Sequence, residues 1–175
     1  HRTALYLSPT KALARDQLRA VRSFALAGVR ASAYDGDTPA EDRPMIRRSA
    51  NLVMTNPDML HRGILPSHER WAGFLGRLAF VVVDEAHTLR GVFGSHVAAI
   101  LRRLRRLTGH YGANPVFVLA SATLGNPAEL AGRLVGLPVE AVAEDGSPRG
   151  PVSFALWEPP LLDEATGLRR SANTE

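Results

Sequence analysis

Two adjacent carboxylates follow a run of four apolar residues near the middle of the chain. The run is Phe80–Val83, and Asp84, Glu85 and His87 come directly after it in the string FVVVDEAH. A surface strand would alternate apolar and polar residues, so this run predicts a strand covered on both faces in a parallel sheet. Open α/β sheets bind their ligands at the carboxyl ends of such strands. Because unpaired buried charge is costly, we expect the two carboxylates to face a ligand.

The chemistry that suits this pair is the hydrolysis of a nucleotide phosphate. Phosphoryl transfer needs charge neutralisation and an oriented water more than it needs covalent catalysis. Asp84 suits holding the Mg²⁺ of a nucleotide through metal-bound waters. Glu85 suits orienting the attacking water and accepting its proton. Taken alone, the pair is equally well explained as the N-cap of a helix.

Apolar strands alternate with amphipathic helices along the chain. The predicted strands cover Thr3–Leu7, Val29–Tyr34, Asn51–Met54, Phe80–Val83, Pro115–Ala120, Val139–Val142 and Val152–Trp157. Helices are predicted over Lys11–Leu26, from the capping box Thr38–Glu41 to about Ser49, and from Thr55–Leu60 onward. A turn and short helices are predicted over His61–Gly76. A long helix through Val97–Leu107 and a helix over Asn126–Val135 follow. This alternation predicts an α/β fold with a parallel sheet and helices on both faces.

Four of the predicted strands end in small polar clusters. The clusters are SPTK, TNPD, DEAH and SAT, and each follows a short apolar run. The carboxyl ends of parallel strands lie on one edge of the sheet, so we expect the four clusters to line one crevice.

Composition limits the classes of protein to which the chain can belong. The 175 residues fit one domain, and no apolar run approaches the length of a membrane span. The absence of cysteine excludes disulfides and thiolate metal sites, and we expect a cytoplasmic protein without a membrane partner. A net charge of +4 allows a nucleic-acid partner. All but one of the 21 basic residues are arginine, however, and a GC-rich genome would produce the same bias.

The order and spacing of the clusters resemble the first RecA-like domain of superfamily 2 helicases with a DEAD/DEAH box. PTKALARDQ resembles motif Ia, TNPDML motif Ib, DEAH motif II and SAT motif III. The longer strings YDGDTP, TNPDMLHRGILP, HTLRGVFGSHVAAILRRLRRL and DGSPRGP are similar to DNA-repair helicases of bacteria, archaea and fungi that carry a C-terminal zinc-binding domain, the mitomycin-repair subgroup. Leu89 stands where this subgroup often has tyrosine. The resemblance extends to about Pro160 and implies a three-layer RecA-like fold of the P-loop NTPase class.

The resemblance also implies roles for the residues of motifs II and III. Asp84 and Glu85 are expected to bind ATP and Mg²⁺ and to catalyse hydrolysis. His87, Ser121 and Thr123 are expected to carry the state of hydrolysis to the nucleic acid and to a second RecA-like domain. Because SAT begins 37 residues after the start of DEAH at another strand end, a simple helix cap explains the pair poorly.

A surface for single-stranded or forked DNA is implied as well. Amides at helix N-termini bind phosphates, and donors that ignore base sequence suit a single strand. The same residues are ordinary helix starts, so we expect capping in either case. The arginine pairs of Leu101–Leu107 are expected on the solvated face of a helix, with a duplex-binding stripe as the alternative. The expected DNA contacts are Pro9, Thr10, Lys11, Gly36, Thr55, Asn56, Pro57, Asp58, Arg90 and Gly91.

One expected element is missing from these residues. A phosphate-binding loop has the form GxxxxGK[ST], and the single lysine, Lys11, lies in TKA instead. We therefore expect residues 1–157 to be a helicase ATP-binding domain truncated at its N-terminus, and 158–175 to lead toward a second RecA-like domain. The parent would hydrolyse ATP to move along single-stranded DNA, with the 3′-to-5′ polarity that the subgroup implies. The isolated fragment is expected to be inactive and to associate through apolar surface at the vacated sheet position.

Three alternatives stay open from the sequence. The first is a helicase-like module that binds nucleic acid without turning over ATP. The second is a catalytic zinc site built from Asp84, Glu85, His87 and His96, which lacks the HExxH spacing. The third is a P-loop ATPase that is not a helicase, against which SAT and the motif Ia string argue.

Overall fold

The computed structural model describes residues 2–122, 125–143, 146, 150–155, 158–163 and 165–169. The chain divides into two compact units, His1–Ala141 and Val142–Glu175. In the described part of the second unit, β6 (Leu161–Asp163) pairs antiparallel with β7 (Leu168–Arg169). The strand-end clusters of the sequence all lie in the first unit.

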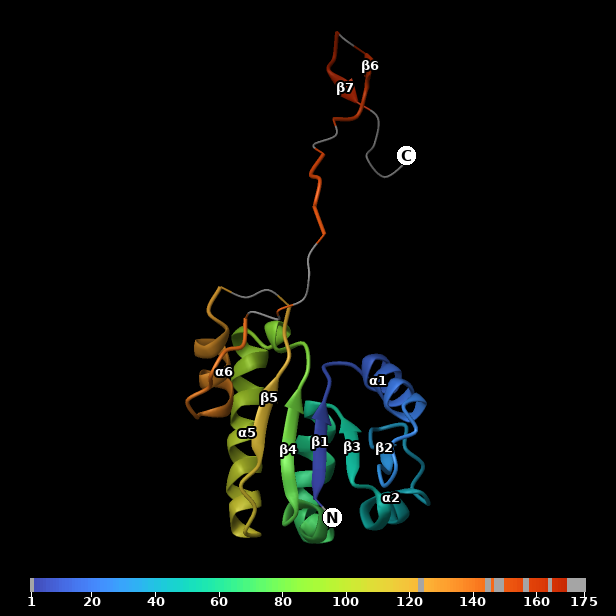
Figure 1. The fold of residues 1–175 in the computed structure, drawn as a ribbon, viewed down its shortest axis with the longest axis vertical. Coiled ribbons are helices and arrows are strands. Elements are labelled where there is room, and N and C mark those ends of the chain that lie inside the picture. The colour runs from blue at the N-terminus through green and yellow to red at the C-terminus, as the bar shows by residue number, and fades with distance from the viewer. Residues whose placement is uncertain are drawn as a thin grey trace. The chain divides into compact units, whose positions relative to one another are not determined.

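The first unit is built on a five-stranded parallel sheet (Figure 1). Its strands are β1 (Thr3–Leu7), β2 (Ala31–Ala33), β3 (Leu52–Thr55), β4 (Leu78–Val83) and β5 (Val116–Leu119). Across the sheet the order is β2-β3-β1-β4-β5, so β2 and β5 form the edges among the described residues. Every pairing is parallel, and the predicted α/β fold with a parallel sheet is confirmed.

Helices and short turns connect these strands. They are α1 (Lys11–Ser23), α2 (Arg43–Ser49), α3 (Pro57–Met59), the π-helix η1 (Leu60–Ile64), the 3₁₀-helix η2 (Leu65–Trp71), α4 (Ala72–Leu75), the 3₁₀-helix η3 (Ala86–Thr88), α5 (Gly91–His110) and α6 (Pro127–Val135). The turn and short helices predicted between β3 and β4 are therefore present.

The two faces of the sheet receive alternate residues of each strand, and one face is closed by α5. Leu5, Val53 and Val81 lie on this face and are almost completely buried, as are Leu101 and Leu104 of α5. Each such side chain contributes about 1.5–3 kcal/mol when it is fully removed from water. The main core of the first unit therefore lies between α5 and the sheet.

The opposite face is covered by α1 over only part of its width. Ala14 and Leu18 of α1 are buried against Met54 of β3, and Tyr6 of β1 packs at the margin of this cluster. Beyond β1 the same face is open: Phe80 of β4 is 44% exposed.

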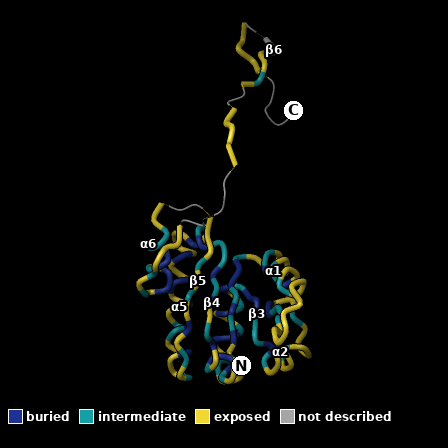
Figure 2. Tube along the Cα trace, in the orientation of Figure 1, coloured by how far each residue is buried: buried dark blue, intermediate teal, exposed yellow. Residues whose placement is uncertain are grey.

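The open surface continues onto β5, where Val116 and Val118 are 57% and 46% exposed (Figure 2). Val116 is paired with Phe80 across the two strands. The prediction that Phe80–Val83 is covered on both faces is therefore wrong for Phe80, because α1 packs on β1, β2 and β3 instead. We call the surface of Phe80, Val116 and Val118 the open patch.

The helix predicted to begin at Thr38 begins at Arg43 instead. The Thr38 hydroxyl does not cap a helix, because it accepts a hydrogen bond from the amide of Asp35 at 2.9 Å. That bond closes a turn between residues 35 and 38. Four further residues separate this turn from the start of α2. The capping-box interpretation of Thr38–Glu41 is therefore wrong.

Two predicted strands, one at the end of the first unit and one in the second unit, are absent from the described residues. Residues 139–142 and 152–155 form no strand, and Leu156 and Trp157 lie outside the described residues. Val142, Val152 and Phe154 are all strongly exposed, with no described strand beside them to pair their backbone groups. Apolar residues alone did not make these segments strands.

Candidate functional site

The DEAH residues follow β4 at the carboxyl edge of the sheet and are fixed to both neighbouring strands. The amide of Asp84 donates to the carbonyl of Leu7 in β1 at 2.8 Å. The amide of Ala86 donates to the carbonyl of Ala120, just past β5, at 2.9 Å. These two backbone bonds hold the turn after β4 between β1 and β5.

Both oxygens of the Asp84 carboxylate accept a hydrogen bond. The amide of Glu85 donates to Oδ1 at 2.9 Å, and the hydroxyl of Tyr6 donates to Oδ2 at 2.6 Å. Burial, and then this hydrogen bond and the nearby carboxylate charges, raise the pKa of Tyr6, so the phenol keeps its proton. Asp84 itself is partly exposed, which leaves the remaining lone pairs of its oxygens open to a ligand.

The backbone of Glu85 adopts a left-handed conformation, with φ 51° and ψ 41°. A residue other than glycine rarely takes this conformation, which costs about 1–3 kcal/mol. The surrounding strand ends hold the strained turn in place through the bonds of Asp84 and Ala86. The side chain of Glu85 is 40% exposed, so its carboxylate is accessible at the edge.

His87 lies between the DEAH turn and the segment after β5. Its Nδ1 is 3.2 Å from Oε2 of Glu85 and 3.4 Å from the amide nitrogen of Ala122. A single ring nitrogen can donate to Glu85 or accept from Ala122, but it cannot do both at once. The structure thus brings His87 together with the backbone next to Ser121, whereas Thr123 lies outside the described residues.

The predicted DNA contacts of motifs Ia and Ib lie at two helix starts on the same edge. The Thr10 hydroxyl accepts from the amide of Leu13, and Oδ1 of Asn56 accepts from the amide of Met59 at 2.8 Å. The predicted capping roles of Thr10 and Asn56 are confirmed. Thr55 is buried, and its hydroxyl has no hydrogen-bond partner among the described residues.

The other predicted contacts, from these two motifs and from Arg90 and Gly91 after the DEAH box, differ in exposure. Pro9 is partly exposed, Pro57 is buried at the first position of α3, and Asp58 is exposed. Arg90 and Gly91 are exposed at the start of α5, and Gly91 has φ +58°, which glycine accommodates without strain. These side chains therefore share an edge but not a common accessible surface.

Lys11 and Gly36 are brought together although 25 residues separate them in the sequence. A Cβ at Gly36 would lie 3.4 Å from Nζ of Lys11. Nζ of Lys11 donates to Asp37 Oδ1 at 2.6 Å, and Nη2 of Arg15 donates to Asp37 Oδ2 at 2.7 Å. The hydrogen bond from Lys11 is the main cause that lowers the pKa of Asp37. One carboxylate therefore holds both cations beside the start of α1.

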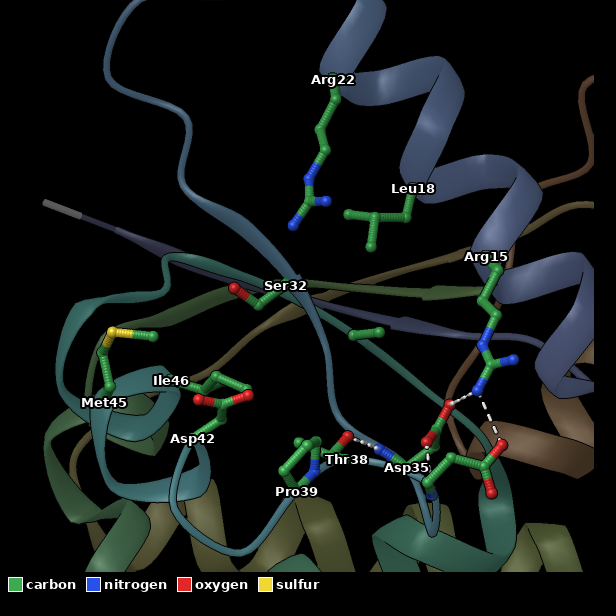
Figure 3. A pocket seen from close by; sticks show the side chains of 12 residues that line it. Arg15, Leu18, Arg22, Ser32, Asp35, Thr38, Pro39, Asp42, Met45 and Ile46 are labelled. Carbon is green, nitrogen blue, oxygen red and sulfur yellow. Dashed lines mark hydrogen bonds and ion pairs between the residues drawn. The ribbon is translucent and has the colours of Figure 1, made fainter.

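A cavity of about 400 Å³ lies between α1, β2 and α2, beside this cluster. Figure 3 shows Arg15 and Arg22 of α1 reaching toward it, with Asp35 beside Arg15 and Asp42 on the opposite side. The Arg15 guanidinium also lies 3.9 Å from the buried carboxylate of Asp35. Sequence reasoning missed Arg15 and Asp37, because their contact joins a loop to a helix far along the chain.

Comparison with known proteins shows the family to which the chain belongs. The DEAD/DEAH box helicase family model matches residues 1–130, which include the strand-end clusters. The chain belongs to the DEAD/DEAH box helicases. It is 45% identical over 98% of its length to the uncharacterized ATP-dependent helicase YprA of Bacillus subtilis, of which it covers 23%. It is 44% identical over 93% of its length to the ATP-dependent helicase HRQ1 of Saccharomyces cerevisiae, of which it covers 16%.

Solved helicase structures show the same arrangement. A crystal structure of the DUF1998 helicase MrfA bound to DNA superposes with a TM-score of 0.93 at 44% identity, covering 98% of this chain and 23% of that one. A structure of MrfA bound to DNA and AMPPNP superposes with a TM-score of 0.89, with 98% and 24% covered. The RecA-like fold and the repair-helicase subgroup predicted from the sequence are confirmed. This helicase domain spans less than a quarter of the relatives YprA and HRQ1.

Two arginines of this helicase domain have a role that the sequence did not indicate. Arg102 donates to the carbonyl of Arg133 at 3.0 Å, and Arg105 donates to the carbonyls of Val135 and Gly136. The last carbonyls of a helix lack intrahelical partners and carry partial negative charge. Arg102 and Arg105 therefore cap the C-terminus of α6. The arginine pairs still lie toward solvent as predicted, with Arg102 and Arg106 exposed and Arg103 and Arg105 partly exposed.

The described residues offer no cluster suited to zinc. No group of three or more His, Asp or Glu side chains in this part of the chain is placed to hold a metal ion. Asp84 and Glu85 instead offer oxygen ligands, which Mg²⁺ prefers, and Mg²⁺ keeps several of its waters. The donor set at the edge therefore fits hydrated Mg²⁺.

Among the described residues, no helix combines the length and the apolarity that crossing a membrane requires.

Proposed function

We propose that this chain is the first RecA-like domain of a longer helicase that hydrolyses ATP to move along single-stranded DNA. The observation that carries the proposal is the position of Asp84 and Glu85. Both carboxylates are partly exposed at the carboxyl edge, in a strained turn bonded to β1 and β5. Because the relatives are more than four times as long as the stretch they share with this chain, the phosphate-binding loop and the second RecA-like domain would be supplied by other residues of the protein.

Each carboxylate would have a distinct task. Asp84 would hold hydrated Mg²⁺, and the ion would supply the charge that neutralises the phosphates of ATP. Glu85 would orient the attacking water and accept its proton. His87 Nδ1 would contact either Glu85 or the amide of Ala122, and so would pass from the DEAH turn to the segment of Ser121 and Thr123, which follow β5 in the sequence. These three residues would report hydrolysis to the DNA and to the second RecA-like domain.

Single-stranded or forked DNA would follow the β1–β3 part of the edge. The amides at the start of α1 and the side chain of Lys11 would bind phosphates without reading base sequence. Support comes from the placement of Lys11 beside Gly36 and from the similarity to MrfA, whose structures are described as bound to DNA. The remaining proposed contacts are Pro9, Thr10, Thr55, Asn56, Pro57, Asp58, Arg90 and Gly91.

The proposal extends to the organisation and setting of the protein. Residues 1–157 would belong to the ATP-binding domain, and 158–175 would lead toward the second RecA-like domain. The cytoplasm is the proposed location, which suits a chain without cysteine. DNA repair is the proposed process, by similarity to the subgroup.

The test is the steady-state rate of ATP hydrolysis by the full-length protein with and without single-stranded DNA. We expect hydrolysis that requires Mg²⁺ and is stimulated by DNA. The second candidate function is a module that binds nucleic acid without ATP turnover. It is favoured by one observation, because Lys11 and the start of α1 follow β1, whereas Asp84 and Glu85 follow β4, so the proposed DNA contacts do not use the carboxylate pair. DNA binding without DNA-stimulated hydrolysis would support that candidate and reject the helicase proposal.

A further inference from the structure

The hydroxyl of Tyr6 contacts the DEAH box from a neighbouring strand, outside all four strand-end clusters. Tyr6 lies opposite Val82 in the parallel register of β1 and β4. Side chains alternate between the two faces of a strand, so Val82 and Asp84 share a face, and Tyr6 is the diagonal neighbour of Asp84 on that face. A tyrosine side chain is long enough to span this diagonal, and its hydroxyl reaches Oδ2 of Asp84 at 2.6 Å.

The hydrogen bond is of the strong, charge-assisted kind. A separation of about 2.5–2.7 Å is typical of a hydroxyl that donates to a carboxylate. The second oxygen, Oδ1, is held by the amide of Glu85 at 2.9 Å. With one donor on each oxygen, the plane of the carboxylate is fixed, whereas a free aspartate would choose among several rotamers. Each oxygen keeps a second lone pair for a ligand.

We propose that Tyr6 is a positioning residue that orients Asp84 toward the hydrated Mg²⁺ of bound ATP. The inference rests on the proposed function of Asp84. Groups that hydrogen-bond a metal-binding carboxylate fix its orientation, and their loss typically weakens metal affinity about 10–100-fold. Tyr6 acts from β1, so it also ties the metal-binding turn to the strand that leads into α1.

The structure separates this role from ordinary packing. The ring of Tyr6 packs against the apolar cluster formed by α1 and β3. Tyr6→Phe keeps that ring and removes the hydroxyl alone. A matched control is Tyr111→Phe, because the Tyr111 hydroxyl forms a bond of similar length, 2.7 Å, with Nδ1 of His68 and touches neither Asp84 nor Glu85.

The experiment compares wild type, Tyr6→Phe and Tyr111→Phe in the full-length protein. ATP hydrolysis is titrated with Mg²⁺, and we expect Tyr6→Phe to raise the half-saturating Mg²⁺ concentration about tenfold. Turnover at saturating Mg²⁺ is expected to stay within about threefold, because Glu85 is untouched. The second readout is binding of Mn²⁺ with a non-hydrolysable ATP analogue, followed by electron paramagnetic resonance, with about tenfold weaker binding in Tyr6→Phe alone.

The outcomes separate the inference from the proposed function. Wild-type metal affinity in Tyr6→Phe overturns the positioning role and leaves the helicase proposal intact. Equal losses in Tyr6→Phe and Tyr111→Phe also overturn it, because they indicate general destabilisation. A wild-type protein that binds the Mn²⁺–analogue complex but hydrolyses no ATP rejects the proposed function, and the binding data still decide the role of Tyr6.

Discussion

The carboxyl edge of the sheet has two halves that differ in which polar, charged and apolar groups they leave available for binding. In the β1–β3 half, Thr10 and Asn56 cap helices, Lys11 is paired with Asp37, and α1 covers the sheet beneath. In the β4–β5 half, partly exposed carboxylates stand on a strained turn above the open patch. In the first half the helix starts and Lys11 have partners, although the buried hydroxyls of Ser8 and Thr55 have none among the described residues, whereas the second half has both charge and apolar surface available for binding.

This difference corresponds to the two ligands of the proposed function. A surface for DNA can be complete within one domain, because it needs only amides and cations along an edge. A nucleotide site needs many donors around the phosphates in addition to a metal-binding carboxylate. The open patch would then be covered by residues of the longer protein. The β4–β5 half is therefore where changes should have different effects in this chain and in the full-length protein.

The largest expected difference in stability is between substitutions on the two faces of the sheet. Leu101→Ala removes a fully buried side chain between α5 and the sheet, and we expect the free energy of unfolding to fall by about 2–5 kcal/mol. Val118→Ala in the open patch should cost less than about 1 kcal/mol in the same chain, because Val118 is already half in water. Chemical denaturation of the 175-residue chain measures both. Similar losses would show that the open patch is covered in solution.

The next effect concerns the segment that follows β5. Ser121→Ala combined with Thr123→Ala should reduce DNA unwinding by the full-length protein about tenfold, which corresponds to about 1.4 kcal/mol of lost coupling. DNA-stimulated ATP hydrolysis should change less, because neither hydroxyl is expected to bind the metal or the attacked phosphate. Both rates are measured on one preparation. Equal losses would mean that the segment is catalytic or structural rather than a coupling element.

A smaller effect is expected in the β1–β3 half. Lys11→Ala should weaken single-stranded DNA binding about equally for all base sequences. The slope of the logarithm of the binding constant against the logarithm of the salt concentration should fall by about one, because about one counterion fewer is released. Asp37→Asn should act in the opposite direction, because it releases Lys11 and Arg15 to the DNA. Fluorescence anisotropy at several salt concentrations measures both. Arg19→Ala, on the same helix but paired with Asp16, is the control and should leave binding unchanged.

The smallest effect on stability is expected from changes within the open patch itself. Val116→Ser with Val118→Ser should leave the midpoint of unfolding nearly unchanged, because both residues are exposed. It should, however, abolish self-association of the 175-residue chain at high concentration, since exposed apolar surface beside an unpaired strand edge promotes pairing with other chains. Analytical ultracentrifugation decides between the outcomes. A wild-type chain that stays monomeric at high concentration would contradict the expectation.

The parallel sheet and the position of DEAH at a strand end followed from local patterns in the sequence. An apolar run that meets carboxylates indicates a buried strand leading to an edge, and such a pattern needs no knowledge of distant contacts. The contact between Tyr6 and Asp84 could not be predicted this way, because it depends on the register of β1 against β4. The pairs of Asp37 with Lys11 and Arg15 likewise depend on how a loop folds back over α1.

Other features of the sequence were misleading because two uses of one side chain compete. Thr38 has the pattern of a capping box, yet its hydroxyl closes a turn with Asp35. Arg102 and Arg105 have the spacing of a solvated helix face and are at least partly exposed, but their guanidinium groups also cap the end of α6. In both cases the outcome is decided by which backbone groups come within reach after folding, and the sequence pattern does not contain that information.

The most direct measurement is the steady-state ATPase rate of the full-length protein with Glu85→Gln. The substitution removes the proposed base but keeps Asp84 and its two hydrogen bonds, so Mg–ATP binding should change little. Turnover should fall by about two to four orders of magnitude. Glu129→Gln is the control, because Glu129 pairs with Arg133 on the surface of α6 and should leave the rate unchanged. Turnover within a few-fold of wild type in Glu85→Gln would contradict the assignment of the catalytic edge.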